Sequence, residues 1–259
     1  MLAILNCQSA IGNGDFNYSG NLYAIDFTPI YNRALRRNGS PEALSQRLLD
    51  PISTPQLRQL QDHRYLAMMA KVVFQAGFVW RVIDNKWPDF ESVFLGFNPE
   101  KLLLLSPEQV EAMGKNKRIV RNHQKINSVF ANALYIYDQQ QEYGSFASMV
   151  ADWPHENFMG LCQHLKKHGS RLGGMSGPRM LRNMGVDAYL LTGDVSMCLR
   201  EAGLDIAEHP TSQRDEKKVQ ALFNHWHQQT GYSFTRLSRI CACSIGTNYG
   251  DKDVPAISD

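Results

Sequence analysis

The stretch Leu172–Leu204 constrains the fold more than any other part of the chain, because it combines a glycine-rich turn with two short apolar helices. Gly173, Gly174 and Gly177 allow a tight turn in which the backbone comes close to a bulky neighbour. Pro178 suits the first turn of the helix that follows, and apolar residues then recur at helical spacing. The stretch therefore predicts two helices joined by a close corner.

The start of the helix after the turn is a candidate phosphate site. The first N–H groups of a helix lack intrahelical partners and carry partial positive charge. Arg171, Arg179 and Arg182 flank the turn, and Ser176 lies within it. A phosphate is expected at Gly173–Gly177, with Ser176 and Arg179 contributing. The alternative is an ordinary helical corner, which would contain the same glycines.

Asp194 stands at the start of the second helix, which Gly203 is expected to end. A Gly-Asp-Val-Ser run before an apolar helix is typical of an N-cap. The same position would also suit a catalytic carboxylate, seventeen residues after Gly177 (194 − 177 = 17). Both interpretations stay open here, and they can hold together.

Composition indicates a soluble globular protein with no metal or cofactor site. The chain has 259 residues, 43% hydrophobic and 20% charged, enough for one sizeable core or two lobes. No apolar run would span a bilayer, and Met1–Asn6 lacks the features of a secretory signal. The five scattered cysteines show no zinc-binding spacing, so we expect reduced thiols, no zinc and a cytoplasmic location.

Charge is unevenly spread along this chain, although its net value is only +2. Lys115–Lys125 and Lys166–Arg182 each contain five basic residues and no acidic one. Such windows favour a side of the protein that faces a polyanion. A pair of solvated loops would give the same pattern, and that alternative also stays open.

The segment His63–Asn85 predicts one long helix that is apolar nearly all round and hence buried. Gly77 in the middle of it would cost about 1 kcal/mol relative to alanine, which indicates close packing or a ligand. Trp80 near its end could stack on a nucleic-acid base. Ordinary packing in the core is the alternative for Trp80.

No alternating strand or repeat is evident, so the fold class is all-α, with about ten helices and short connections. We expect a loosely ordered extension over 1–26, a helical domain over 27–245 with its hairpin motif at about 165–204, and a tail over 246–259. The other helices are expected at 27–37, 89–96, 127–141, 145–153, 157–168, 217–230 and 234–245, with further starts at Pro41 and Pro107.

Three segments resemble the DNA-3-methyladenine glycosylase I family: Phe74–Trp80 (FQAGFVW), Asp89–Pro99 and Arg118–Ile126 (RIVRNHQKI). Their order and spacing agree over roughly Tyr65–Pro154. That family belongs to the helix–hairpin–helix DNA glycosylases, and Leu172–Asp194 resembles their hairpin and downstream aspartate. The resemblance implies a two-lobed helical fold that holds DNA phosphates at the hairpin and turns the target nucleotide out of the duplex.

The resemblance also assigns residues. Trp80 falls where the family has the tryptophan that stacks on the alkylated base. The family glutamate that reads the adenine edge falls at Val72, which accepts no hydrogen bond. Gln75 could replace it, and Tyr31 is a weaker pocket candidate. The family's zinc ligands have no counterpart, and the absence of lysine near Arg179 argues against a lyase step.

The resemblance thus implies a monofunctional DNA glycosylase that hydrolyses the N-glycosidic bond of alkylated purines in base excision repair. Asp194 would stabilise positive charge on the sugar, while Lys125 would join the hairpin in holding phosphates. The expected partner is double-stranded DNA with an alkylated base; no membrane is involved, and the protein is expected to be a monomer. The alternatives are a non-catalytic hairpin module that binds damaged DNA and a glycosylase with another base specificity.

Overall fold

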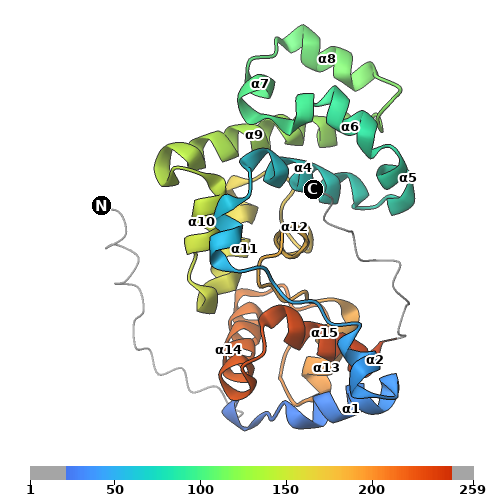
Figure 1. The fold of residues 1–259 in the computed structure, drawn as a ribbon, viewed down its shortest axis with the longest axis vertical. Coiled ribbons are helices and arrows are strands. Elements are labelled where there is room, and N and C mark those ends of the chain that lie inside the picture. The colour runs from blue at the N-terminus through green and yellow to red at the C-terminus, as the bar shows by residue number, and fades with distance from the viewer. Residues whose placement is uncertain (1–21, 247–259) are drawn as a thin grey trace.

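In the computed structural model, which describes residues 22–246, every regular element is a helix (Figure 1). This confirms the prediction of an all-α fold. No helix in that range is long and apolar enough to cross a membrane. Most of the predicted N-terminal extension, with Cys7, and most of the predicted tail lie outside the described residues. The proposed domain limits stay a prediction.

Two groups of helices form an upper and a lower lobe, with three helices between them (Figure 1). The upper lobe comprises α4 (Asp62–Gln75), α5 (Trp80–Asn85), α6 (Trp87–Val93), α7 (Pro99–Leu103), α8 (Pro107–Lys115) and α9 (His123–Tyr143). The lower lobe comprises α1 (Thr28–Asn38), α2 (Pro41–Ser45), α13 (Gly193–Glu201), α14 (Gln213–Thr230) and α15 (Phe234–Ile245). Between them lie α10 (Phe146–Asp152), α11 (Phe158–His168) and α12 (Ser176–Asn183), and α3 (Thr54–Gln59) covers α10.

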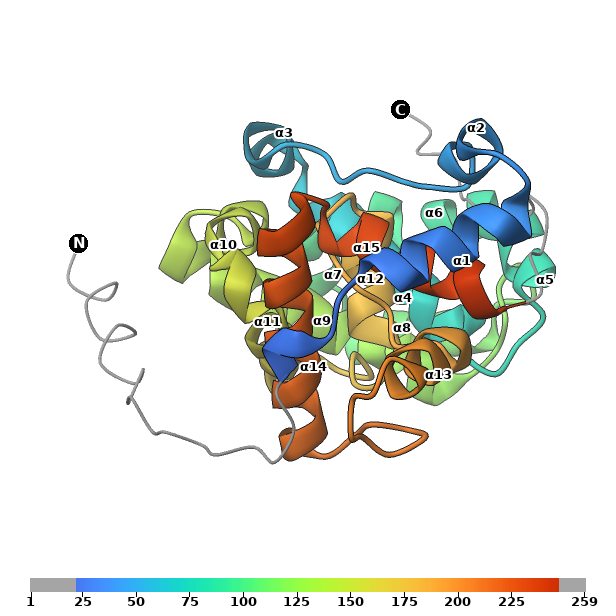
Figure 2. The same cartoon turned by 90° about the horizontal axis from the view of Figure 1, so that it is seen from below.

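Each lobe has its own aromatic core. In the upper lobe, Phe74, Phe90, Phe94 and Phe97 are fully buried, and the half-buried Trp87 ring stacks on two of them. The lower lobe is centred on Tyr189, Phe223, Trp226, Phe234 and Phe27. Viewed from below, α1 crosses α15, and α13 packs against α15 (Figure 2).

The sequence predicts where helices begin more accurately than it predicts whether a helix continues without a break. The predicted start at Pro107 is confirmed, because Ser106 and Gln109 form a capping box. In contrast, the single helix predicted over 63–85 is wrong. The chain breaks between α4 and α5, where Gly77 adopts φ +71°, a left-handed conformation that ends a helix. We call residues 76–79 the elbow.

Several short helices raise the number of α-helices in residues 22–246 to fifteen, above the ten or so expected. One of the additional helices is α3, for which Ser53 and Gln56 form a capping box. Helix α9 begins at His123, four residues before its predicted start, because Asn122 caps it. Local side-chain caps explain both differences.

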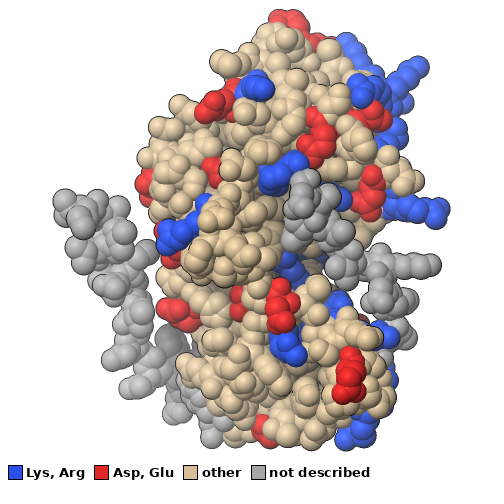
Figure 3. All heavy atoms as spheres, in the orientation of Figure 1, with Lys and Arg blue, Asp and Glu red and all other residues tan. Residues whose placement is uncertain are grey.

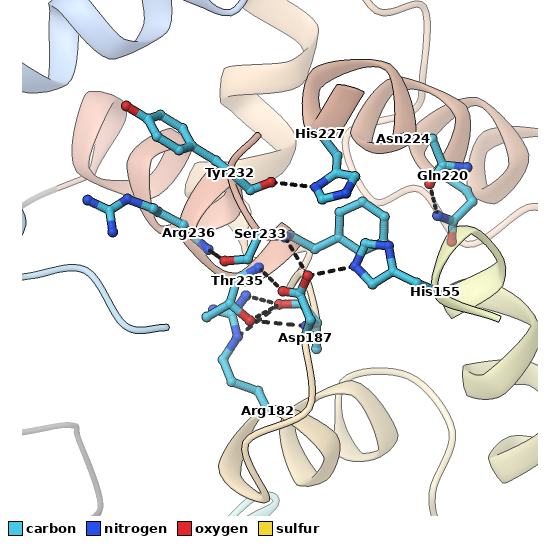
Figure 4. Close-up of polar contacts among 12 residues, drawn as sticks. His155, Arg182, Asp187, Gln220, Asn224, His227, Tyr232, Ser233, Thr235 and Arg236 are labelled. Atoms are coloured by element: carbon cyan, nitrogen blue, oxygen red, sulfur yellow. Dashed lines mark hydrogen bonds and ion pairs between the residues drawn. The ribbon is translucent and has the colours of Figure 1, made fainter. Parts of the chain in front are cut away.

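The strap that joins α12 to α13 is fixed to the lower lobe by Asp187 (Figure 4). One carboxylate oxygen of Asp187 accepts hydrogen bonds from His155 Nε2 at 2.6 Å and from the Phe234 N–H at 3.0 Å. The other accepts one from the Thr235 N–H at 2.7 Å. Asp187 thus occupies the N-terminal end of α15, where a negative charge is stabilised.

Arg182, on the last turn of α12, supports the same strap. Its guanidinium donates hydrogen bonds to the Ala188 carbonyl, with Nε at 3.1 Å, and to the Ser238 hydroxyl. Burial lowers the pKa of Arg182 to about 9. This arginine is therefore part of the framework, although the sequence placed it in a basic window.

We predict that Asp187→Asn destabilises the fold in a pH-dependent way. Burial alone would raise the pKa of Asp187, but the hydrogen bonds from His155, Thr235 and Phe234 hold the pKa below 3.8. Its ionised form therefore contributes stability above the unfolded-state pKa, and that contribution disappears as pH falls through the folded-state pKa. At pH 7 the variant should lose about 1–3 kcal/mol.

Urea denaturation between pH 7 and pH 3.5 would measure the effect. The gap in unfolding free energy between wild type and Asp187→Asn should narrow as pH falls below about 4. Asp138→Asn, an exposed carboxylate on α9, serves as the matched control. A gap that is constant over this range would contradict the role given to the Asp187 charge.

Candidate nucleic-acid interface

The elbow exposes a run of apolar side chains at the edge of the upper lobe. Phe78, Val79 and Trp80 are 45%, 66% and 40% exposed, respectively. Trp80 is the first residue of α5, so its ring lies outside the aromatic core of that lobe. Core packing is therefore wrong as an explanation for Trp80. Its ring is available to stack on a planar partner.

Lys125 holds the elbow in place from α9. Its ammonium donates hydrogen bonds to the Phe74 carbonyl at 3.1 Å and to the Ala76 carbonyl at 2.7 Å, and it lies 5.6 Å from the centre of the Phe78 ring. Burial, with a further contribution from the positive charge of Arg171, lowers the pKa of Lys125. The predicted phosphate contact of Lys125 is thus replaced by the capping of α4.

Gln75 also has a structural partner. It is buried, and its amide Nε2 donates to Asp84 Oδ1 at 3.3 Å. The Lys71 ammonium pairs with the same Asp84 oxygen at 3.0 Å, so these three side chains join α4 to α5 across the elbow. Val72 is buried in the core. The amide nitrogen of Gln75 is used within the protein, which weakens its case as a base-reading group.

The glycine-rich corner between α11 and α12 is a tight turn between two helices, and we call residues 169–178 the hairpin. Gly174 adopts φ +58°, and Arg171 adopts φ +62°. A Cβ atom on Gly177 would lie 2.6 Å from the Leu172 carbonyl oxygen, so only glycine permits this turn to close. The predicted close backbone approach is confirmed at Gly177, where α12 folds back onto the turn.

Three consecutive backbone N–H groups in this turn have no hydrogen-bond acceptor among the described residues. Within residues 22–246, the N–H groups of Gly173, Gly174 and Met175 donate no hydrogen bond. They precede α12, which begins at Ser176 and carries partial positive charge at its N-terminal end. A row of free N–H groups at such a helix start can bind an anionic oxygen.

Asn132 on α9 fixes the hairpin to the upper lobe. Its amide donates to the Ser170 carbonyl at 3.1 Å and accepts from the Ser170 N–H at 2.7 Å, and the side chain is 1% exposed. Arg171, the next residue, donates to the exposed Gln124 side chain at the start of α9. This role of Asn132 could not be predicted from the sequence, because its hydrogen-bond partner, Ser170, lies thirty-eight residues away along the chain.

Trp80 and Arg179 meet across the space between the elbow and the hairpin. The Arg179 guanidinium carbon lies 4.5 Å from the centre of the Trp80 ring, a cation–π contact. Arg179 belongs to α12, which packs against α4. The structure therefore brings together two of the predicted site residues, one from the base-stacking set and one from the phosphate-binding set.

Asp194 lies in the first turn of α13, but it is not the helix cap. Thr192 is the N-cap, because its hydroxyl accepts a hydrogen bond from the Val195 N–H at 3.3 Å. The N-cap interpretation of Asp194 is therefore wrong. Its half-buried carboxylate packs against Gly246 at the end of α15, and it forms no hydrogen bond or ion pair with another described residue. Gly203 ends the helix as predicted, with φ +99°.

The contacts of Asp194, with Gly246, and of Trp80, with Arg179, have no residue in common. Tyr31 lies apart from Trp80's surroundings: it belongs to α1 in the lower lobe, where its ring lies 6.3 Å from that of Tyr232. Of the predicted pocket residues, Tyr31 is the one for which the structure offers least support.

A cavity of about 290 Å³ lies on the lower-lobe side of the hairpin. Neither Trp80 nor Asp194 lines it. Its walls are largely apolar and include Gly174, Met175 and Pro178 from the hairpin with Cys162, Tyr189 and Ser196 from the elements around it. No local sequence pattern predicts this cavity, because its walls come from four separate helices and the segments between them.

The two basic windows are only partly available to a polyanion. Lys115 pairs with Glu111, and Arg118 pairs with Asp89. Lys125 and Arg182 are engaged inside the protein. Figure 3 shows Lys and Arg side chains gathered at the edge of the upper lobe beyond α5 and α8. Exposed basic residues that flank the elbow, the start of α9 and the hairpin in the sequence are Arg81, Arg121, Lys166, Lys167 and Arg171.

Within the described residues, no group of three or more His, Cys, Asp or Glu side chains is placed to hold a metal ion. The four described cysteines are free and buried.

We predict that Asn132→Ala destabilises the protein by about 1–3 kcal/mol, because it leaves the half-buried N–H and carbonyl of Ser170 without partners. Thermal or urea denaturation would measure the loss. Asn127→Ala, an exposed asparagine on the same helix, should change stability by less than about 0.5 kcal/mol. Equal losses for the two variants would show that Asn132 does not anchor the hairpin.

Comparison with known proteins gives one family match. Residues 56–170, which contain the elbow and end at the start of the hairpin, match the family model described as methyladenine glycosylase. This matched part includes Trp80, Lys125 and Asn132, but not Arg179 or Asp194.

Solved structures of similar fold are remote in sequence. A 3-methyladenine DNA glycosylase I from Staphylococcus aureus is 19% identical, with 71% of this chain and 100% of that one covered and a TM-score of 0.45. An 8-oxoguanine glycosylase/lyase from Methanocaldococcus jannaschii, bound to DNA containing 8-oxoguanine, is 12% identical, with 83% and 95% covered and a TM-score of 0.49.

Proposed function

Because residues 56–170 match the family model described as methyladenine glycosylase, we propose that the chain is a DNA glycosylase that removes alkylated purines. The observation that carries the proposal is the Trp80 ring, exposed at the elbow and already stacked against a planar cation. An N3- or N7-alkylated purine is also a planar cation. The guanidinium of Arg179 therefore occupies the kind of position that such a base would take.

DNA would be held by the hairpin. The free N–H groups of Gly173, Gly174 and Met175 at the start of α12 suit a phosphate oxygen, and Arg171 and Lys166 are exposed beside them. The bound strand would then run past the elbow, where Trp80 can receive a base turned out of the duplex. This assigns backbone binding and base binding to neighbouring parts of one surface.

The chemical step asks little of the protein, because alkylation has already made the purine a good leaving group. What remains is to stabilise positive charge that develops on the deoxyribose and to orient water. Asp194 is the acidic residue that we propose for this role, since its carboxylate lies in the first turn of the helix after the hairpin and has no partner among the described residues.

Trp80→Ala should lower kcat/KM for release of 3-methyladenine from methylated duplex DNA by about 5- to 150-fold, because base stacking contributes about 1–3 kcal/mol. Chromatographic detection of the free base gives the rate. Val82→Ala, an exposed apolar residue on the same helix, should retain nearly full activity. Equal rates for Trp80→Ala and wild type would remove Trp80 from the base site.

Asp194→Asn should reduce release of the methylated base by about 100-fold or more, with DNA binding nearly unchanged. Asp138→Asn, an exposed carboxylate on α9, is the matched control. Release by both wild type and Asp194→Asn at equal rates would retain the enzyme and exclude Asp194 from its mechanism. Tight binding of methylated DNA without release by any variant would instead favour a non-catalytic module that binds damaged DNA.

A further inference from the structure

Arg179, a candidate for binding phosphate, contacts the Trp80 ring on which we propose that a base stacks. The guanidinium lies over the ring at 4.5 Å, a distance at which no second planar group fits between them. Arg179 reaches the ring from α12, the helix that begins at the hairpin. The covered face is therefore the one turned toward the DNA-binding corner.

Arg179 is also within reach of the phosphate site. It is the fourth residue of α12, so it lies one turn from the free N–H groups of Gly173, Gly174 and Met175. The Arg179 guanidinium lies over Trp80 in this structure, and because helical side chains lean toward the N-terminal end of their helix, another rotamer would bring it to that site. A phosphate bound there would attract it and offer two parallel hydrogen bonds.

The two positions of the guanidinium are mutually exclusive, since one planar group cannot cover the indole and bind a phosphate oxygen elsewhere. We infer that Arg179 covers the Trp80 ring until a DNA phosphate at the hairpin draws the guanidinium away and opens the ring to the extruded base. Arg179 thereby couples backbone binding to base binding. This inference rests on the proposed function for the choice of base.

The coupling has a consequence that a purely structural arginine would not show. A free base brings no phosphate, so it must displace the guanidinium from the ring unaided. Removing Arg179 should therefore strengthen the binding of free 3-methyladenine and weaken the binding of DNA. Opposite signs for the two ligands distinguish a covering residue from a simple binding residue.

The first experiment measures affinity by titration calorimetry in wild type, Arg179→Ala, Arg179→Lys and Arg81→Ala. For free 3-methyladenine, Arg179→Ala should bind about 3- to 30-fold more tightly than wild type. For undamaged duplex DNA at low salt, it should bind about 3- to 10-fold more weakly. Arg179→Lys keeps the charge but loses the planar group, so it should gain affinity for the free base while nearly retaining DNA affinity.

Arg81→Ala is the matched control, because Arg81 is an exposed arginine next to Trp80 on α5. It should weaken DNA binding and leave the affinity for the free base unchanged. Equal or weaker binding of the free base by Arg179→Ala would overturn the inference, because the covered face would then not be the one that the base uses.

The second experiment does not depend on the identity of the base. Acrylamide quenching of Trp80 fluorescence, isolated by difference against Trp80→Phe, reports exposure of the ring. In wild type, quenching should rise when undamaged duplex DNA is added, whereas in Arg179→Ala it should be high from the start. Quenching that does not rise with DNA in wild type would refute the covering role. If quenching behaves as expected but no variant binds or releases 3-methyladenine, the proposed substrate fails and the coupling stands.

Discussion

Helix α9 sets the geometry of the candidate interface, because it holds both of its parts with two buried polar side chains. Lys125 caps the end of α4 and so fixes the elbow, while Asn132 pairs with the backbone of Ser170 and so fixes the hairpin. The two residues are seven apart (132 − 125 = 7), which is about 10 Å along one face of a helix. The distance between the elbow beside Trp80 and the turn at Gly173–Gly177 is therefore determined by one helix, α9.

Lys125 and Asn132 are both buried polar side chains, and removing either one would leave backbone groups without hydrogen-bond partners. A buried ammonium is stable only when it is fully hydrogen-bonded, and here the carbonyls at the end of α4 supply the partners. The amide of Asn132 likewise satisfies both backbone groups of Ser170 at once. Movement of the elbow or the hairpin would leave these groups unsatisfied, so the spacing between them is held firmly.

The sequence predicted those features that depend on neighbours along the chain. The all-α class, the capping box at Ser106, the glycine corner at Gly177 and the helix end at Gly203 all follow from local rules, and each is confirmed. The break at Gly77 was missed because apolar residues continue on both sides of it. Asp194 was misplaced as a cap, since Thr192, two residues earlier, is an equally good cap.

What the sequence could not predict comes from contacts between distant parts of the chain. Lys125 and Arg182 lie in basic windows, and composition alone gave no reason to separate them from the exposed residues beside them. The carbonyls of Phe74 and Ala76, which bind Lys125, lie 51 and 49 residues from it along the chain. The Ser238 hydroxyl, which binds Arg182, lies 56 residues away from that arginine. A count of charges thus overstates the surface that a polyanion would meet.

Under the proposed function, Val72 stands where the family resemblance implies a base-reading glutamate, and this difference would change which bases the site can distinguish. A buried valine accepts no hydrogen bond, so the edge of a purine would be read weakly, and stacking on Trp80 would supply most of the recognition. Stacking alone separates one purine from another poorly, although it favours a cationic ring over a neutral one. Selectivity would then depend on the glycosidic bond itself, because alkylated purines leave readily and unmodified purines do not. Under the proposed function, such a site would accept a range of alkylated bases and leave normal DNA intact.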